Sequence, residues 1–122
     1  MKNLEQIRAY NAITARGKWA GVNDGEVVKK VPTLIRENGL LAAAAFAVDK
    51  KGGYQAVFDA IIAHLADKKI AKLANKMSLE EFIQSVSNSD SSVLWAITSE
   101  SLAYLNYLRR FAKKPAKGEG GE

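Results

Sequence analysis

The spacing of apolar residues predicts helices along the whole chain. Residues 2–20 contain no proline and a single glycine, and they are rich in residues that favour helices, so one long helix is expected there. Its apolar residues fall on two sides: Leu4, Ile7, Ala15 and Trp19 on one, and Ala9, Ile13 and Ala20 on the other. We therefore expect this helix to have neighbours on two sides.

A second helix is predicted where Val27, Val31 and Leu34 recur at helical spacing. The rhythm passes through Pro32 without resetting, which predicts a kink; the alternative is two short helices, the second with proline at its first position. Both alternatives end at Asn38-Gly39, because this pair suits a left-handed C-terminal cap.

Residues 40–48 form the longest apolar run in the chain. Their Ala and Leu content favours a helix that is apolar on every face, so we expect a buried central helix. Nine residues are about half of the ~20 that cross a bilayer. Because residues 1–5 also lack the apolar stretch of a signal peptide, we expect a cytoplasmic protein with no membrane partner.

Three further helices follow. Residues 54–65 carry the cleanest amphipathic stripe, Ser78 and Glu81 have the spacing of a capping box, and a last helix covers about 93–113. No segment alternates at the period of a strand. The sequence thus predicts an all-α fold: one compact bundle of about six helices over residues 1–113, followed by a flexible basic, glycine-rich tail over 114–122.

Composition removes most catalytic chemistry. The 122 residues include no cysteine and one histidine, so disulfides, thiolate metal sites and cysteine nucleophiles are excluded. No Glu-x-x-His motif or phosphate-binding glycine loop occurs. His64 lies at the flank of an amphipathic stripe, which favours a half-buried packing residue over a metal ligand or a base. We expect no metal, no cofactor and no enzyme activity.

The last helix has two apolar faces. Its expected core face holds Val93, Leu94, Ile97, Tyr104, Leu105, Leu108 and Phe111. The opposite side holds Trp95, Leu102, Asn106, Arg109 and Lys113. Aromatic and arginine side chains are enriched at interface centres, so Trp95, Leu102 and Asn106 are the candidate subunit interface. The alternative is a central helix with Trp95 buried on its second side.

The chain is moderately basic, with 18 Lys and Arg against 13 Asp and Glu, a net charge of +5. Basic residues gather in two clusters: Lys68, Lys69, Lys72 and Lys76, and Arg109, Arg110, Lys113, Lys114 and Lys117. Either cluster could contact phosphates, and either could simply be a solvated surface.

Three motifs resemble one known family. They are Val31-Pro32-Thr33-Leu34-Ile35-Arg36-Glu37-Asn38-Gly39-Leu40 followed by Ala44-Ala45-Phe46, an early Gln6-Ile7-Arg8-Ala9, and a closing Tyr107-Leu108-Arg109-Arg110-Phe111-Ala112. Taken in their order along the chain, these motifs resemble the small subunit of type III-B CRISPR effector complexes, the fifth Cmr protein.

The resemblance implies a non-catalytic structural subunit in antiviral defence. Several copies would stack beside the backbone nuclease subunits, with the large polymerase–cyclase subunit at the end, and would help to seat the duplex of guide RNA and target RNA. The expected RNA contacts are Arg8, Arg16, Lys18, Lys68, Lys69, Lys72, Arg109, Arg110 and Lys113. A stand-alone DNA-binding regulator is the alternative, although the helix after its only tight turn, at Gly39, is too apolar to read a groove.

Overall fold

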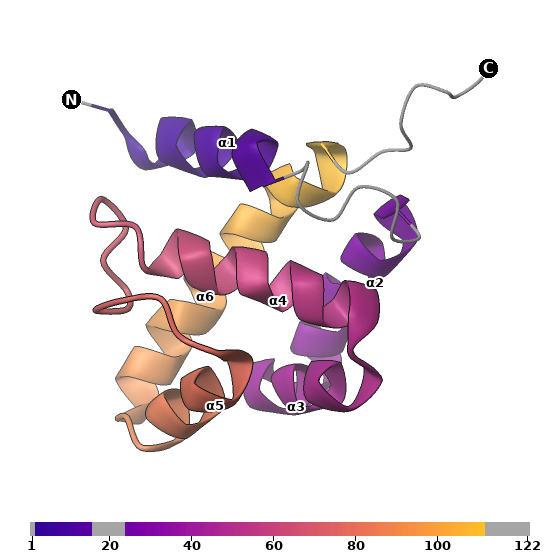
Figure 1. Ribbon diagram of the computed structural model, residues 1–122. Coiled ribbons are helices and arrows are strands. Elements are labelled where there is room, and N and C mark those ends of the chain that lie inside the picture. The colour runs from indigo at the N-terminus through magenta and orange to yellow at the C-terminus, as the bar shows by residue number, and fades with distance from the viewer. Residues whose placement is uncertain (1, 16–23, 112–122) are drawn as a thin grey trace.

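The computed structural model describes residues 2–15 and 24–111, and over these residues it is built from helices without strands. The helices are α1 (Leu4–Ala15), α2 (Asp24–Asn38), α3 (Leu40–Lys50), α4 (Gly52–Leu65), α5 (Leu79–Ser87) and α6 (Ser91–Phe111). Figure 1 shows them gathered into one bundle. The predicted all-α fold of six helices is confirmed. Residues 16–20 and the tail at 114–122 lie outside the described residues.

The helix at the centre of the bundle is α4, which packs against all five of the others. Its large side chains, including Phe58, Ile61 and Leu65, are fully buried. The expectation that residues 40–48 are buried on every face is corrected: α3 buries Leu40 and three alanines on one side, and other alanines of this run are exposed. Alanine has little apolar area to hide, so an alanine-rich helix tolerates water on one face, whereas the bulkier α4 does not.

Helix α2 continues through Pro32 as one helix, so the alternative of two short helices is wrong. It ends as expected at Gly39, whose φ of 95° lies in the region that favours glycine. The backbone N–H of Gly39 donates to the carbonyl of Ile35 at 2.8 Å, which closes the last turn. This sharp end lets α3 begin at once.

Helix α5 begins with the predicted capping box. The hydroxyl of Ser78 accepts a hydrogen bond from the backbone N–H of Glu81 at 3.1 Å, and the carboxylate of Glu81 accepts one from the backbone N–H of Ser78 at 3.0 Å. Both bonds satisfy N–H groups that the start of a helix leaves unpaired. In the described part of the chain, no helix combines the length and the apolar character that a membrane crossing requires.

Candidate subunit and nucleic-acid interface

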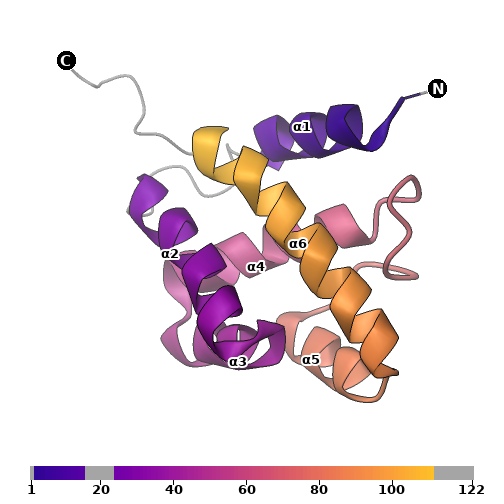
Figure 2. The same ribbon diagram turned by 180° about the vertical axis from the view of Figure 1, so that it is seen from behind.

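The two faces of α6 differ sharply in burial. Ile97, Leu105 and Leu108 are buried on the inner side, whereas Trp95 on the outer side is 73% exposed. Figure 2 shows α6 lying across the front of the bundle, with its outer side turned away from the other helices. The alternative in which Trp95 is buried is therefore wrong, and a large aromatic side chain is left at the surface.

The outer face also carries the other two candidate interface residues. Leu102 is half-buried and Asn106 is exposed, and with Trp95 they follow one side of α6. At 1.5 Å rise per residue, the three extend about 16 Å along the helix. We call Trp95, Leu102 and Asn106 the outer strip. Apolar side chains that line up on an uncovered helix face are typical of a contact surface.

One residue that was predicted to lie on the core face of α6 is exposed in the structure. Val93 is 40% exposed, because it lies in the first turn, at the edge of the bundle. Two polar residues, Glu100 and Ser101, are buried on the inner side instead. The hydroxyl of Ser101 donates to the carbonyl of Ile97 within the same helix at 2.8 Å, but Glu100 has partners on other helices.

Glu100 is the centre of a buried polar cluster that was not predicted from the sequence. One carboxylate oxygen accepts a hydrogen bond from Arg8 Nη2 at 2.7 Å. The other accepts one from Arg8 Nε at 2.8 Å and one from His64 Nε2 at 2.9 Å. The bidentate pair is a strong arrangement, since both of its members are charged. Through it, α1 and α4 are joined to the inner face of α6.

The hydrogen bonds also define the state of His64. Asn11 Nδ2 lies 3.0 Å from His64 Nδ1 and donates to the carboxylate of Asp67, also at 3.0 Å. The amide nitrogen is a donor, so Nδ1 must accept and the ring proton sits on Nε2, facing Glu100. His64 also stacks on Tyr104, with ring centroids 4.1 Å apart and planes 9° from parallel. His64 is therefore a packing histidine, fully rather than half buried.

The pKa values of the cluster follow from burial and these bonds. Burial lowers the pKa of His64, and the neighbouring Glu100 only partly opposes this effect. Burial alone would raise the pKa of Glu100, but hydrogen bonds from Arg8 and His64 outweigh it, so that pKa lies below its usual value. A neutral histidine thus lies beside an ionised glutamate, and both serve to hold three helices together.

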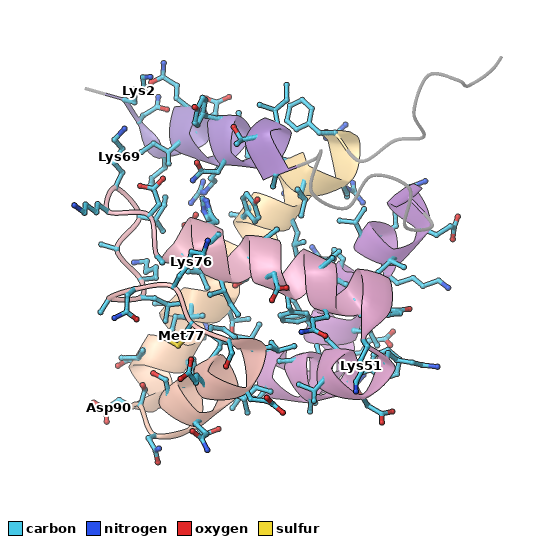
Figure 3. The ribbon with its side chains drawn as sticks, in the orientation of Figure 1. Lys2, Lys51, Lys69, Lys76, Met77 and Asp90 are labelled. Carbon is cyan, nitrogen blue, oxygen red and sulfur yellow. The ribbon has the colours of Figure 1, made fainter. Side chains whose placement is uncertain are left out.

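A pocket of about 530 Å³ opens beside this cluster, between α1, α4 and the loop that precedes α5. Lys76 and Met77 line it from the loop (Figure 3). Burial raises the pKa of Asp59 on its α4 side, and Lys76 partly offsets that rise. In the described part of the chain, no three His, Cys, Asp or Glu side chains are grouped so that they could hold a metal ion.

The predicted RNA-contact residues occupy different places. Lys68, Lys69 and Lys72 are exposed on the loop after α4, where Figure 3 shows Lys69 projecting outward. Arg109 and Arg110 are exposed at the end of α6, on the far side of the bundle from that loop (Figure 1). The structure brings these two groups to separate edges.

Three other predicted contacts, Arg16, Lys18 and Lys113, lie outside the described residues. Arg8 is engaged by Glu100, and its side chain is 21% exposed. The ion pair gives Arg8 a structural role, while its contact with RNA stays a prediction.

The chain matches a protein-family model over most of its length. A model of a family of CRISPR-associated proteins matches residues 5–114, a range that includes nearly all of the six helices. That family is described as CRISPR-associated protein (Cas_Cmr5), and this chain belongs to it. It is therefore a subunit of a Cmr complex and acts with other Cmr effector subunits. The resemblance found in the sequence is confirmed. No solved structure matches the chain.

Proposed function

We propose that this protein is a non-catalytic structural subunit of a type III-B CRISPR effector complex. Several copies stack beside the backbone subunits, and together they help to seat the duplex of guide and target RNA. The observation that carries the proposal is the outer strip of α6, where Trp95 is 73% exposed although the inner face of the same helix is fully packed.

The outer strip has the chemistry of an interface centre. Tryptophan is enriched among residues that dominate binding energy, because it buries a large area and still offers an N–H donor. Leu102 extends the apolar contact and Asn106 adds a donor and an acceptor. A straight strip on one helix suits a helix of another subunit, either a second copy of this chain or a backbone subunit.

The same face continues toward positive charge. Arg109 lies one turn beyond Asn106 on nearly the same side of α6, and it is exposed. A partner seated on the outer strip would therefore lie next to an arginine that suits phosphate. This position supports a contact with the RNA backbone beside the subunit joint, with the loop lysines Lys68, Lys69 and Lys72 as a second point of attachment.

The non-catalytic role is supported by how the polar groups are used. His64 and Glu100 are the residue types that acid–base chemistry would need, but both are almost completely buried and bonded to structural partners. Membership of a multi-subunit family fits this role, because other subunits can supply the chemistry.

Co-purification tests the proposal. The chain is co-expressed with the other Cmr subunits and a guide RNA, one of the partners carries the affinity tag, and the recovered chain and nuclease-protected RNA are quantified. We expect the double variant Trp95→Ser, Asn106→Ala, in which both native side chains are exposed, to be recovered at less than about one tenth of the native level, because truncating an interface anchor costs ~2 kcal/mol or more.

Val93→Ser is the matched control, since Val93 is an exposed apolar residue of the same helix outside the outer strip. We expect normal recovery of this variant. Native recovery of the double variant would contradict the proposal. If the native chain purifies alone with chromosomal DNA, the stand-alone DNA-binding regulator is supported instead.

A further inference from the structure

A groove of about 320 Å³ lies between α2, α3 and α4, and none of its residues belongs to the predicted contact sites. Its lining consists of Glu26, Lys29, Lys30, Thr33, Leu34, Phe46 and Tyr54. The residues of α2 follow one face of that helix, whereas the two aromatic residues come from the neighbouring helices. The groove is therefore a shared surface of three elements that pack against one another.

The apolar part of the groove is an aromatic pair. Phe46 and Tyr54 meet edge to face, with ring centroids 5.1 Å apart and planes at 88°. Both side chains are half-buried, so the packing that fixes them still leaves ring surface open to the groove. A ring held in this way offers one flat face, and another planar group can stack on that face without the ring first having to be ordered.

The rim of the groove is positively charged. Lys29 and Lys30 are exposed along α2, and Lys50 lies with its Nζ 5.8 Å from the centre of the Phe46 ring. Glu26 is the one acidic lining residue. The ion pairs of residues 2–15 and 24–111 involve none of these lysines. Two lysines, Lys29 and Lys30, thus line the groove with the single carboxylate of Glu26 to offset them, and Lys50 adds a third positive charge beside the Phe46 ring.

We propose that this groove binds one unpaired nucleotide of single-stranded RNA. The base stacks on the Tyr54 ring, which Phe46 holds in place edge to face, and the adjacent phosphates contact Lys29 and Lys30. Aromatic residues beside a basic surface are the usual means of holding unstacked bases, and every base offers a face for stacking. The volume is at the small end of ligand sites, which suits a single nucleotide and not a duplex.

RNA fits this surface better than an acidic peptide does. A peptide carboxylate would satisfy the lysines but would leave the aromatic pair without a planar partner. A nucleotide satisfies both, because its charge and its flat apolar group are about one sugar apart. The choice of RNA rests on the proposed function, whereas the site itself is separate from the outer strip of α6.

The test is a titration of the full chain with a fluorescently labelled single-stranded RNA of about ten nucleotides, at about 50 mM salt so that phosphate contacts are not screened. Tyr54→Leu keeps the position apolar and removes the ring. We expect it to weaken binding about tenfold, the effect of losing one base–aromatic stack. The matched control is Tyr10→Leu, since Tyr10 is 66% exposed on α1, and we expect it to bind as the native chain does.

A second probe separates stacking from charge. The same oligonucleotide made without bases keeps every phosphate, so we expect the native chain to bind it about tenfold more weakly and Tyr54→Leu to bind it as the native chain does. Lys30→Gln should weaken binding of both probes, whereas Lys2→Gln should weaken neither. Circular dichroism confirms that each variant is folded.

Several results would overturn the inference: no binding of the RNA, equal effects of Tyr54→Leu and Tyr10→Leu, equal losses by Tyr54→Leu on both probes, or tighter binding of an acidic peptide of matched charge. Co-purification with the Cmr subunits distinguishes this failure from failure of the proposed function. Assembly with the Cmr subunits does not depend on this groove, so we expect both the native chain and Tyr54→Leu to enter the complex normally. If both do so while the RNA titration shows no effect of Tyr54→Leu, only the groove proposal fails.

Discussion

The two faces of α6 show how one helix meets two different demands. The inner face is closed: Ile97, Leu105 and Leu108 are buried, and Glu100 has both of its oxygens hydrogen-bonded. The outer face leaves Trp95 in water. The exposed Trp95 therefore contributes little to folding and is available for a partner, whereas the half-buried Leu102 also packs against the core.

Helix α1 is attached to the inner face of α6 mainly by polar contacts, unlike the apolar packing in the rest of the core. Helix α1 buries only Ile7 and two alanines, so it offers little apolar area to the bundle. Its attachment depends on polar contacts instead, through Arg8 and Asn11. Tyr104 adds a long hydrogen bond of 3.4 Å to the backbone carbonyl of Asn11. The polar cluster therefore determines where α1 lies on α4 and α6.

The largest effect is expected from Glu100→Ala. Removing one member of a buried pair leaves Arg8 and His64 without their acceptor, and such losses cost ~3–5 kcal/mol. Since Arg8 is partly exposed, we expect about 3 kcal/mol, measured as the free energy of unfolding in urea. Ser99→Ala, at the exposed neighbouring position, is the control. A loss below about 1 kcal/mol would show that the inner face does not depend on the cluster.

Trp95→Ala should separate the two faces. We expect the free energy of unfolding to change by less than about 0.5 kcal/mol, because the side chain is mostly exposed. Binding to the Cmr partners should weaken by about 2 kcal/mol, which is roughly 30-fold. Both quantities are measured on the same preparation, by denaturation and by titration. A variant that loses stability and keeps its affinity would reverse our assignment of the faces.

Ser78→Ala measures how much a purely local contact contributes to the stability of the protein. It removes the hydroxyl that accepts from the backbone N–H of Glu81, and loss of a helix cap costs ~1 kcal/mol. Thermal unfolding should therefore show a smaller loss than for Glu100→Ala, while binding to the partners is unchanged. If Ser78→Ala lowers the stability of the protein as much as Glu100→Ala does, the buried cluster contributes no more to stability than a single helix cap.

The smallest effect concerns pH. The pKa of His64 is lowered by burial, so below about pH 6.5 the unfolded chain binds a proton that the folded chain does not yet bind. Stability should accordingly fall as the pH drops through that value. The carboxylates Glu100 and Asp67 have lowered pKa values, and their contribution is lost only at more acidic pH.

The variant His64→Gln isolates this titration. Glutamine can still donate to Glu100 but does not titrate, so its free energy of unfolding should be flatter than that of the native chain between about pH 5 and 7. Urea denaturation at several pH values measures both curves. Parallel curves would mean that His64 is not the titrating group.

Local signals were sufficient for most of the fold. Apolar spacing identified six helices, and Gly39 and the Ser78–Glu81 box marked where two of them end and begin, because these contacts lie within a few residues of each other. The assignment of the central helix failed, since burial depends on side-chain size as well as apolarity. The pairing of Arg8 with Glu100, 92 positions apart, has no local signal. A glutamate between Ile97 and Tyr104 was the one available hint.

The candidate interface was predictable only in part. Helical projection placed Trp95, Leu102 and Asn106 on one face, but whether that face is covered depends on the packing of all the other helices. The groove at Phe46 and Tyr54 was not foreseen, because its residues come from three helices and each one, taken alone, resembles a core or a surface position.

The central claim, that the outer strip is a subunit contact, is tested most directly by hydroxyl-radical footprinting of Trp95. Oxidation of Trp95 is measured by mass spectrometry in the isolated chain and in the assembled Cmr complex, with the exposed Tyr10 as an internal reference. We expect Trp95 to be oxidised readily when the chain is alone and to be protected about tenfold or more on assembly, because hot-spot residues are excluded from water. Equal oxidation of Trp95 in the two states would contradict the account.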